Sequence, residues 1–226
     1  PTKGSRPAKF QYQGDNLVIA LDSDLSHQLT TLAQQQGCSL FSIMLTVFNV
    51  LLSKYSGQSD IIVGTPMANR HHPDVLELIG LFVNTVPLRT HVDGSASFLA
   101  LLAQVTKTVE QAQHNQDVPF EQIVDDLSVS RDSSRHPIYQ VMFSIDEFSG
   151  QEAAAQNAGF EHVDLAPYYH VAKQDMSLYV SRHGEQLTLA MNWATALFTQ
   201  ASIEQFLSHY QELLSSITAY PQQRLA

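Results

Sequence analysis

The sequence contains little cysteine, little positive charge and no long hydrophobic run. Its single cysteine, Cys38, allows no internal disulfide and no cluster of thiolate metal ligands. The 226 residues include 12 Lys and Arg against 22 Asp and Glu, a formal net charge of −10 that disfavours nucleic acid or an anionic membrane as partner. The longest apolar stretch, residues 40–52, is too short to cross a bilayer. We therefore expect a cytoplasmic protein that binds neither nucleic acid nor membrane.

The motifs of several common enzyme classes are also absent from the sequence. We find no P-loop, dinucleotide fingerprint, nucleophile elbow or Cys/His metal spacing. Cys38 has no obvious base beside it, and we interpret it as a small residue at a helix start. A hydrophobic content of 44% with 15% charged residues is nevertheless typical of a globular chain. These observations leave a folded domain without a familiar catalytic signature.

Predicted helices and strands alternate along the chain, which indicates an α/β fold with a mixed sheet flanked by helices. Apolar runs and alternation predict strands over residues 16–21, 60–64, 82–89, 138–145, 177–183 and 186–193. Helical periodicity and capping residues predict helices over 23–36, 39–55, 97–114 (with a start at 95 as the alternative), 119–127 and 199–217. The second helix is apolar on nearly every face, which is typical of a central core helix. We expect a loop with a helical turn over 66–78 and a mobile loop over 151–159.

Two neighbouring histidines, His71 and His72, are the first candidates for chemistry. Such a pair can act as a general base or bind a metal. These two precede Pro73 and Asp74, where a turn is expected, and no further ligand follows at a suitable spacing. We interpret the pair as part of a surface loop, with contact to a substrate or partner as the alternative.

Asn84 is a polar residue in an apolar row. On a strand over 82–89, it shares one face with Phe82, Val86 and Leu88. A buried amide must find hydrogen-bond partners. Two interpretations stay open: Asn84 fixes a neighbouring loop, or it faces a channel that carries an amide-containing substrate.

Two further polar segments have sufficient structural explanations. Asp117 can cap the short helix that Pro119 begins, and Glu121 lies in the first turn, where both carboxylates suit the helix dipole. Farther along, a local knot of ion pairs and hydrogen bonds can position the following strand, and its members are Arg131, Asp132 and Arg135. Phosphate binding by the two arginines is the alternative for this knot.

Taken together, three segments resemble the fifth, sixth and seventh core motifs of the condensation domains of nonribosomal peptide synthetases. Residues 79–85 with Arg89 resemble the fifth motif, and residues 114–121 contain the sixth, Asn/His-Gln-Asp-Tyr/Val-Pro-Phe-Glu. Residues 131–138 are similar to the seventh, with His136 where asparagine is usual. The resemblance implies a scaffold role for Gly80, Arg89, Gln116, Asp117, Pro119, Glu121, Arg131, Asp132 and Arg135.

The first four motifs of that family do not occur in this sequence. They include His-His-x-x-x-Asp-Gly, whose second histidine is the family's catalytic residue. His71 and His72 do not fit that motif, because no Asp-Gly follows at the required offset. The resemblance thus implies a C-terminal lobe over residues 13–226, an extended lead-in over residues 1–12 from a missing N-terminal lobe, and neither a catalytic nor a metal-binding residue in this chain.

The resemblance also implies a fold and a set of partners. The family's two lobes resemble chloramphenicol acetyltransferase and enclose a tunnel, where an acceptor amine attacks a donor thioester and a peptide bond forms. This lobe would supply one wall, with Asn84 and Thr85 near the tunnel, a floor loop over 68–80 and a latch after Phe143. The expected partners are the N-terminal lobe, donor and acceptor peptidyl carrier proteins, and a neighbouring adenylation domain. The chain would bind no cofactor directly, since 4′-phosphopantetheine is carried by the carrier proteins.

Related domains remain alternatives to this interpretation. Epimerization, heterocyclization and acyltransferase domains share the superfamily, and a module that only docks a carrier protein belongs to another functional class. Because the family's catalytic histidine lies in the upstream motifs, we expect this chain alone to form no peptide bonds.

Overall fold

The computed structural model describes residues 2–70, 72–130, 132–147 and 170–225. Within them, one mixed sheet has six strands in the order β1-β6-β5-β4-β2-β3. The strands are β1 (Gly14–Ala20), β2 (Asp60–Met67), β3 (Asn84–His91), β4 (Val141–Glu147), β5 (Met176–His183) and β6 (Gln186–Ala194). β4 runs parallel to β2 and β5, and the other neighbours are antiparallel. The expected α/β fold with a mixed sheet is confirmed.

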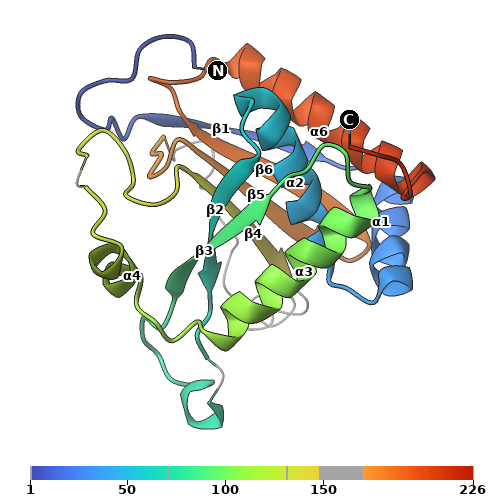
Figure 1. Ribbon diagram of the computed structural model, residues 1–226, viewed down its shortest axis with the longest axis horizontal. Helices are drawn as coiled ribbons and strands as arrows, with labels where there is room; N and C mark the ends of the chain where they lie inside the picture. Colours follow the sequence, from blue (N-terminus) through green and yellow to red (C-terminus); the bar gives the residue numbers. More distant parts are fainter. Residues whose placement is uncertain (1, 71, 131, 148–169, 226) are drawn as a thin grey trace, which may run out of the picture.

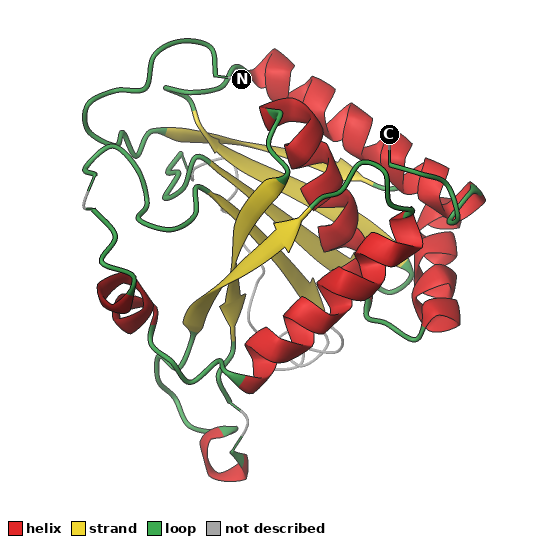
Figure 2. Ribbon diagram, in the orientation of Figure 1, coloured by secondary structure: helices red, strands yellow, loops and turns green. Residues whose placement is uncertain are grey.

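Four of the described helices cover one face of this sheet (Figures 1 and 2). They are α1 (Ser23–Gln36), α2 (Leu40–Ser56), α3 (Phe98–His114) and α6 (Gln200–Ala219), while the short α4 (Phe120–Asp126) lies near the N-terminal end of β3. Each of the four begins where a side-chain oxygen accepts from the helix backbone, at Asp22, Ser39, Ser97 and Thr199. Local capping chemistry therefore accounts for the predicted starts of these helices.

Helix α2 forms the centre of the core, as its apolar faces predicted. Phe48 packs its ring against Phe143 of β4 at 5.6 Å between centroids, and against Phe206 and Tyr210 of α6 at 6.0 Å each. The buried Tyr210 hydroxyl donates to the Met44 carbonyl at 2.8 Å, so its polar atom is satisfied. Among the described helices, none is long and apolar enough by itself to span a membrane; α1 and α2 meet that test only as a pair bent by 106°.

Two strands begin later than predicted. β3 begins at Asn84 instead of Phe82, because Asn84 pairs with Met67, the last residue of β2, and no strand continues beyond that pair. β4 begins at Val141 instead of residue 138, since its pairing with both β2 and β5 starts there. Pro87 lies on the edge strand, as predicted. The loop expected over 151–159 lies outside the described residues.

Residues 2–12 contain no helix or strand and are fastened to the rest of the chain. The amide of Lys3 donates to the Leu197 carbonyl at 2.8 Å. The guanidinium of Arg6 binds the carboxylate of Asp175 through two nitrogens, and Asp175 is only 6% exposed. This extended lead-in is therefore held by a largely buried ion pair to the segment before β5.

Candidate functional site

The sheet face opposite α1, α2, α3 and α6 carries an unusual number of polar side chains, and we call it the polar face. Strand register places Asn192 of β6 beside Asn16 and Ser177, and places Tyr179 beside Ser144. On the helix-facing side, the same strands present Leu, Met, Phe and Val. Its polar side chains include Asn16, Thr85, Ser144, Ser177, Tyr179 and Asn192, and Gly64, Met142 and Pro87 lie on the same face.

Tyr139 lies over this face and is almost fully buried. A Cβ atom on Gly64 would lie 2.4 Å from its ring, so only glycine leaves room for the phenol at that point of β2. Burial raises the pKa of Tyr139 to about 12, opposed in part by side-chain hydrogen bonds with Thr85 and Gln174. At neutral pH this phenol therefore stays protonated.

A cavity of about 240 Å³ opens beside these residues. The Asn192 amide donates to Asn16 Oδ1 at 2.8 Å and to the Val171 carbonyl at 3.1 Å, which fixes one of its walls. Amide, hydroxyl and ammonium groups thus surround a space that suits a polar ligand with its own amides. The lining residues are Asn16, Val171, Lys173, Gln174, Tyr179 and Asn192.

Asn84 lies at the start of β3 on the same side of the sheet as the buried Val86. Its Nδ2 donates to the carbonyls of Gln116 and Val118 at 2.7 Å each, and its Oδ1 accepts from the amide of Phe120 at 3.3 Å. Both ends of the side-chain amide are engaged with the loop between α3 and α4. The geometry therefore favours the loop-fixing interpretation, and contact between Asn84 and a substrate stays a prediction.

Helix α4 begins without the cap that the sequence predicted. The N-cap residue is Pro119 and not Asp117, so the prediction of Asp117 at the N-cap is wrong, and proline supplies no side-chain hydrogen bond. The free amide of the first turn, Phe120 N, is bound instead by Asn84 from the neighbouring strand. Glu121 lies in the first turn as predicted. A long-range contact has replaced the local cap.

Of the ion-pair and hydrogen-bond knot predicted before β4, the ion pair between Asp132 and Arg135 is present. Arg135 Nε lies 2.9 Å from Asp132 Oδ2, and the amide of Ser134 donates to Asp132 Oδ1 at 2.8 Å. The hydrogen bond from Ser134, with a smaller effect of Arg135, holds the pKa of Asp132 below its ordinary value. Arg131 lies outside the described residues.

His136, the residue that departs from the family pattern, packs against two aromatic rings. Its ring centroid is 5.0 Å from that of Phe120 and 4.1 Å from that of Tyr139. Burial lowers the pKa of His136, and its buried Nδ1 has no hydrogen-bond partner within the described part of the chain. The neutral imidazole therefore belongs to a cluster of three rings, in which Phe120 of α4 also contacts Tyr139 directly at 5.6 Å between centroids.

Other predicted candidates lie away from the polar cavity. His72 Nδ1 accepts the amide of Asp74 at 3.3 Å, which suits a surface turn, and His71 lies outside the described residues. Arg89 binds Asp60 at the exposed sheet edge, Nε to Oδ1 at 2.9 Å and Nη2 to Oδ2 at 2.8 Å. Burial raises the pKa of the Cys38 thiol, which disfavours the reactive thiolate. In the residues that the structure describes, no group of three His, Cys, Asp or Glu side chains could hold a metal.

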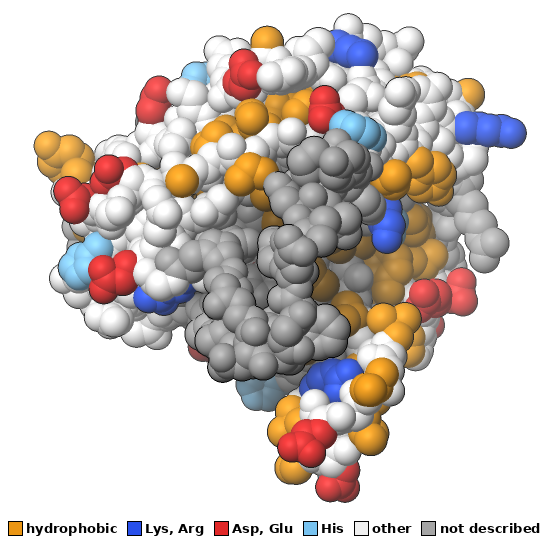
Figure 3. Space-filling model, turned by 180° about the vertical axis from the view of Figure 1, so that it is seen from behind, with side chains coloured by type: hydrophobic (Ala, Val, Ile, Leu, Met, Phe, Trp, Pro, Cys, Tyr) orange, Lys and Arg blue, Asp and Glu red, His pale blue; other side chains and the backbone are white. Residues whose placement is uncertain are grey.

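Between β2 and β3, residues 72–83 leave the sheet as a projection that we call the arm (Figure 1). The short turn η1 (Pro73–Val75) confirms the predicted helical turn. Apolar side chains gather on the arm (Figure 3), and Ile79 and Leu81 are 105% and 91% exposed. The exposed large apolar residues of the arm are Leu76, Leu78, Ile79, Leu81 and Val83. An exposed apolar row of this kind is a candidate interaction surface.

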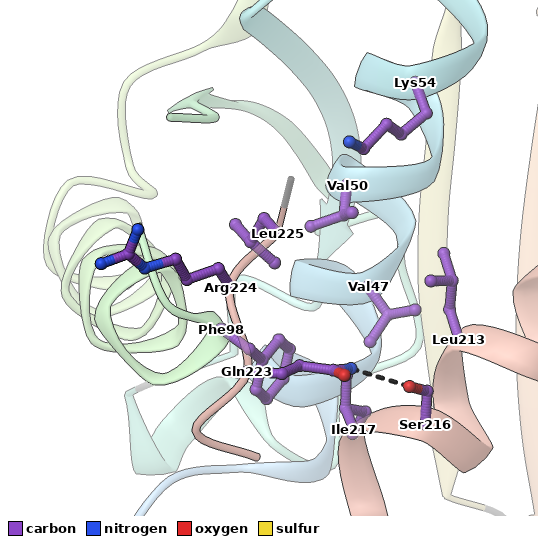
Figure 4. A pocket seen from close by; sticks show the side chains of 10 residues that line it. All are labelled: Val47, Val50, Lys54, Phe98, Leu213, Ser216, Ile217, Gln223, Arg224 and Leu225. Atoms are coloured by element: carbon purple, nitrogen blue, oxygen red, sulfur yellow. Dashed lines mark hydrogen bonds between the residues drawn. The ribbon is translucent and has the colours of Figure 1, made fainter. Parts of the chain in front are cut away.

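A second cavity, of about 280 Å³, lies on the helical side of the sheet between α2, α3, α6 and the C-terminal residues (Figure 4). Its walls are mostly hydrocarbon, and Gln223 Nε2 donates to Ser216 Oγ at 2.7 Å within it. Lys54 supplies a cation at one end. Since the sheet separates this cavity from Thr85 and Tyr139, we place the candidate site on the polar face.

Sequence reasoning missed Tyr139 and Gln174 as members of the site. Gly64 within a predicted buried strand was the available signal, because a glycine there indicates a close approach by another group. Nothing in the local pattern around residues 139 and 174 identified which group approaches.

Comparison with known proteins settles the family. The sequence profile of the condensation domain matches residues 1–226. The chain belongs to the condensation-domain family. Tyrocidine synthase 3 of Brevibacillus parabrevis is 39% identical to it over 226 residues, which cover 98% of this chain and 3% of that protein. In eight of the curated relatives that it matches, this condensation-domain chain spans between 3% and 9% of the relative's length.

Solved condensation-domain structures share the fold. Holo-AB3403, a four-domain nonribosomal peptide synthetase bound to AMP and glycine, superposes with a TM-score of 0.89 at 24% identity, over 100% of this chain and 18% of that one. The condensation domain of the Monacolin K polyketide synthase MokA gives a TM-score of 0.84 at 19% identity, over 97% of this chain and 50% of that one. At these identities the likeness establishes the fold.

Proposed function

We propose that this chain is the C-terminal lobe of a condensation domain and forms one wall of the tunnel in which a peptide bond is made. The observation that carries the proposal is the polar face, where hydroxyl and amide groups gather around Tyr139 and a cavity of about 240 Å³. Two further facts support it: the family match, and the coverage of half of the MokA condensation domain by nearly all of this chain.

In this proposal, the polar face orients the tethered substrates. Tyr139 is 2% exposed and does not line the cavity, so its protonated phenol supports the wall and does not take the proton of the attacking amine. We assign the base to the histidine that the resemblance implies for the N-terminal lobe. Thr85 and Gln174 hold the phenol in place. Asn84 contributes indirectly, by fixing the loop that begins α4.

The phosphopantetheine arm of a donor or acceptor carrier protein suits the cavity on the polar face. Such an arm carries amide groups, and the walls offer both donors and acceptors from Asn16, Gln174 and Asn192. Carrier proteins and a neighbouring adenylation domain are accordingly the partners that we propose, as members of one multidomain synthetase. The chain itself holds no cofactor in this account.

The arm and the segment after Phe143 complete the proposed lobe. We assign the floor of the tunnel to the arm, which overlaps the expected floor segment over 68–80, because its apolar side chains suit burial against the N-terminal lobe. Phe143, after which we expect the latch, lies in β4, and residues 148–169 lie outside the described ranges.

The test is condensation by the complete domain, with loaded donor and acceptor carriers, for Tyr139→Phe and a matched control. Tyr55→Phe is the control, since its hydroxyl bonds His209 Nδ1 at 2.8 Å on the helical side. Loss of the hydrogen bonds that hold Tyr139 to Thr85 and Gln174 loosens the wall and predicts roughly tenfold slower single-turnover amide formation for Tyr139→Phe. Equal rates for both variants would remove the catalytic role of the polar face. Unchanged condensation with weakened carrier binding would favour a docking module instead.

A further inference from the structure

The arm is organised around one guanidinium group. Arg70 follows β2 and turns its side chain toward the carbonyl oxygens of the arm. Its Nη1 donates to the carbonyls of Val75 and Leu78, the latter at 2.8 Å, and its Nη2 donates to the Gly80 carbonyl at 3.1 Å. The carbonyl of Leu76 lies 3.4 Å from Nη1. One side chain thus reaches backbone groups five to ten positions farther along the chain.

The flat face of the same guanidinium packs on an aromatic ring. Arg70 Cζ lies 4.3 Å from the centroid of Phe82. Gly80 also lies against that ring, since a Cβ atom at position 80 would lie 3.0 Å from Phe82 Cε2. The planar group therefore uses its edge for hydrogen bonds and its face for a cation–π contact.

Little else in the described chain holds the arm in one shape. The β2–β3 ladder ends at the pair Met67 and Asn84, so the arm has no sheet partner. Its own backbone bonds are those of the turn, from the amides of Val75, Leu76 and Leu78. Its large apolar side chains are mostly exposed and form no core of their own. Ordering such a segment costs conformational entropy that contacts must offset.

We propose that Arg70 is a positioning residue that folds the arm in advance and presents its apolar side chains in a fixed orientation to the N-terminal lobe. Preorganisation of this kind lowers the ordering cost when the surfaces meet. The orientation toward the N-terminal lobe rests on the proposed function, whereas the folding of the arm by Arg70 does not. Lysine cannot replace Arg70 here, because a point charge offers neither the fork nor the stacking face.

The experiment measures hydrogen exchange of the amides of Val75, Leu76 and Leu78 in this chain. Arg70→Lys and Arg70→Ala should each speed their exchange about fivefold or more, while the β2 and β3 amides keep their protection. The matched control is Arg182→Lys, because Arg182 Nε donates to a single turn carbonyl, that of Gly184, at 3.0 Å far from the arm. This control should leave exchange in the arm unchanged. Unchanged exchange in Arg70→Ala overturns the proposal, whatever the activity.

A second measurement separates this inference from the proposed function. In the complete domain, Arg70→Lys should lower kcat/KM for condensation, with the same Tm as the parent within about 2–4 °C. Faster arm exchange with unchanged kcat/KM would retain Arg70 as the organiser of the arm and refute the arm as tunnel floor.

Discussion

Replacing Asn84 tests the contact that joins β3 to the loop before α4. Asn84→Ala removes two donated bonds of 2.7 Å and one accepted bond of 3.3 Å. Asn84→Asp keeps the size of the side chain and its acceptor, but it places a carboxylate oxygen against the carbonyls of Gln116 and Val118. The two variants therefore separate the loss of packing from the loss of the amide donor.

The magnitude follows from the bonds that are lost. Each intramolecular hydrogen bond contributes about 0.5–1.5 kcal/mol net, and Asn84 is partly exposed, so water recovers some of the three. We expect Asn84→Ala to lower the free energy of unfolding by about 1–3 kcal/mol, which in a chain of this size lowers Tm by roughly 2–4 °C for each kcal/mol. Asn84→Asp should cost at least as much, because the carboxylate faces two acceptors and has no donor to replace the amide.

The assay is urea unfolding at 25 °C together with hydrogen exchange of the Phe120 amide, which Asn84 binds. The matched control is Asn115→Ala, whose amide makes one exposed bond to the Gln111 carbonyl at 2.8 Å and should change stability by less than about 0.5 kcal/mol. A wild-type stability in Asn84→Asp would refute the donor geometry. Product formation in the complete domain then tests the second interpretation: if Asn84→Ala lowers only stability, the side chain does not contact substrate.

Three further changes test other contacts, each by urea unfolding. Gly64→Ala should lower the free energy of unfolding by about 1–3 kcal/mol, because its Cβ would meet the Tyr139 ring. Tyr139→Leu in the same chain should restore part of that loss. An unchanged stability of Gly64→Ala would contradict the packing. Arg6→Ala should lower the free energy of unfolding by about 3–5 kcal/mol, because it leaves the Asp175 carboxylate buried without its cation. Adding Asp175→Asn should restore at least half of this loss. A double variant in which the two losses simply add would contradict the prediction. Burial lowers the pKa of His136 below 6.5, so the unfolded chain binds a proton that the folded chain excludes. The free energy of unfolding of the wild type should therefore be full above about pH 7 and fall as the pH drops through 6.5, and His136→Asn should lose this dependence. Parallel pH curves for the two proteins would refute the prediction.

Local chemistry explains why most elements could be predicted from sequence. The helix starts at Ser97 and Thr199 were predicted because their hydroxyls bind amides within the first turn. The central place of α2 followed from its apolar surface on every side. These features depend on residues within a few positions of one another, and such patterns are visible without a structure.

The missed features depend on residues far apart in the chain. The cap of α4 comes from Asn84, thirty-six positions before Phe120, so the local preference for Asp117 did not decide it. Arg70 organises the arm through backbone carbonyls, which have no signature in the sequence. Strand β3 starts late because its only partner in the described sheet, β2, has ended. In each case a tertiary contact overrode a pattern that was correct locally.

In the candidate site too, the residue within a sequence motif was predicted, and the residue whose surroundings come from distant elements was not. Thr85 was expected near the tunnel from the motif that contains it, and the structure places it on the polar face beside Tyr139. Tyr139 itself carries no motif that would single it out, because its environment is made by β2, β3 and the segment before β5.

The central claim is that this chain supplies a wall of a peptide-bond-forming tunnel but not its base. Its most direct test is single-turnover amide formation between loaded donor and acceptor carriers, with this chain alone, with a separately produced N-terminal lobe alone, and with both. The account predicts product only when both are present. Amide formation by this chain alone, or an equal rate from the N-terminal lobe without it, would contradict the claim.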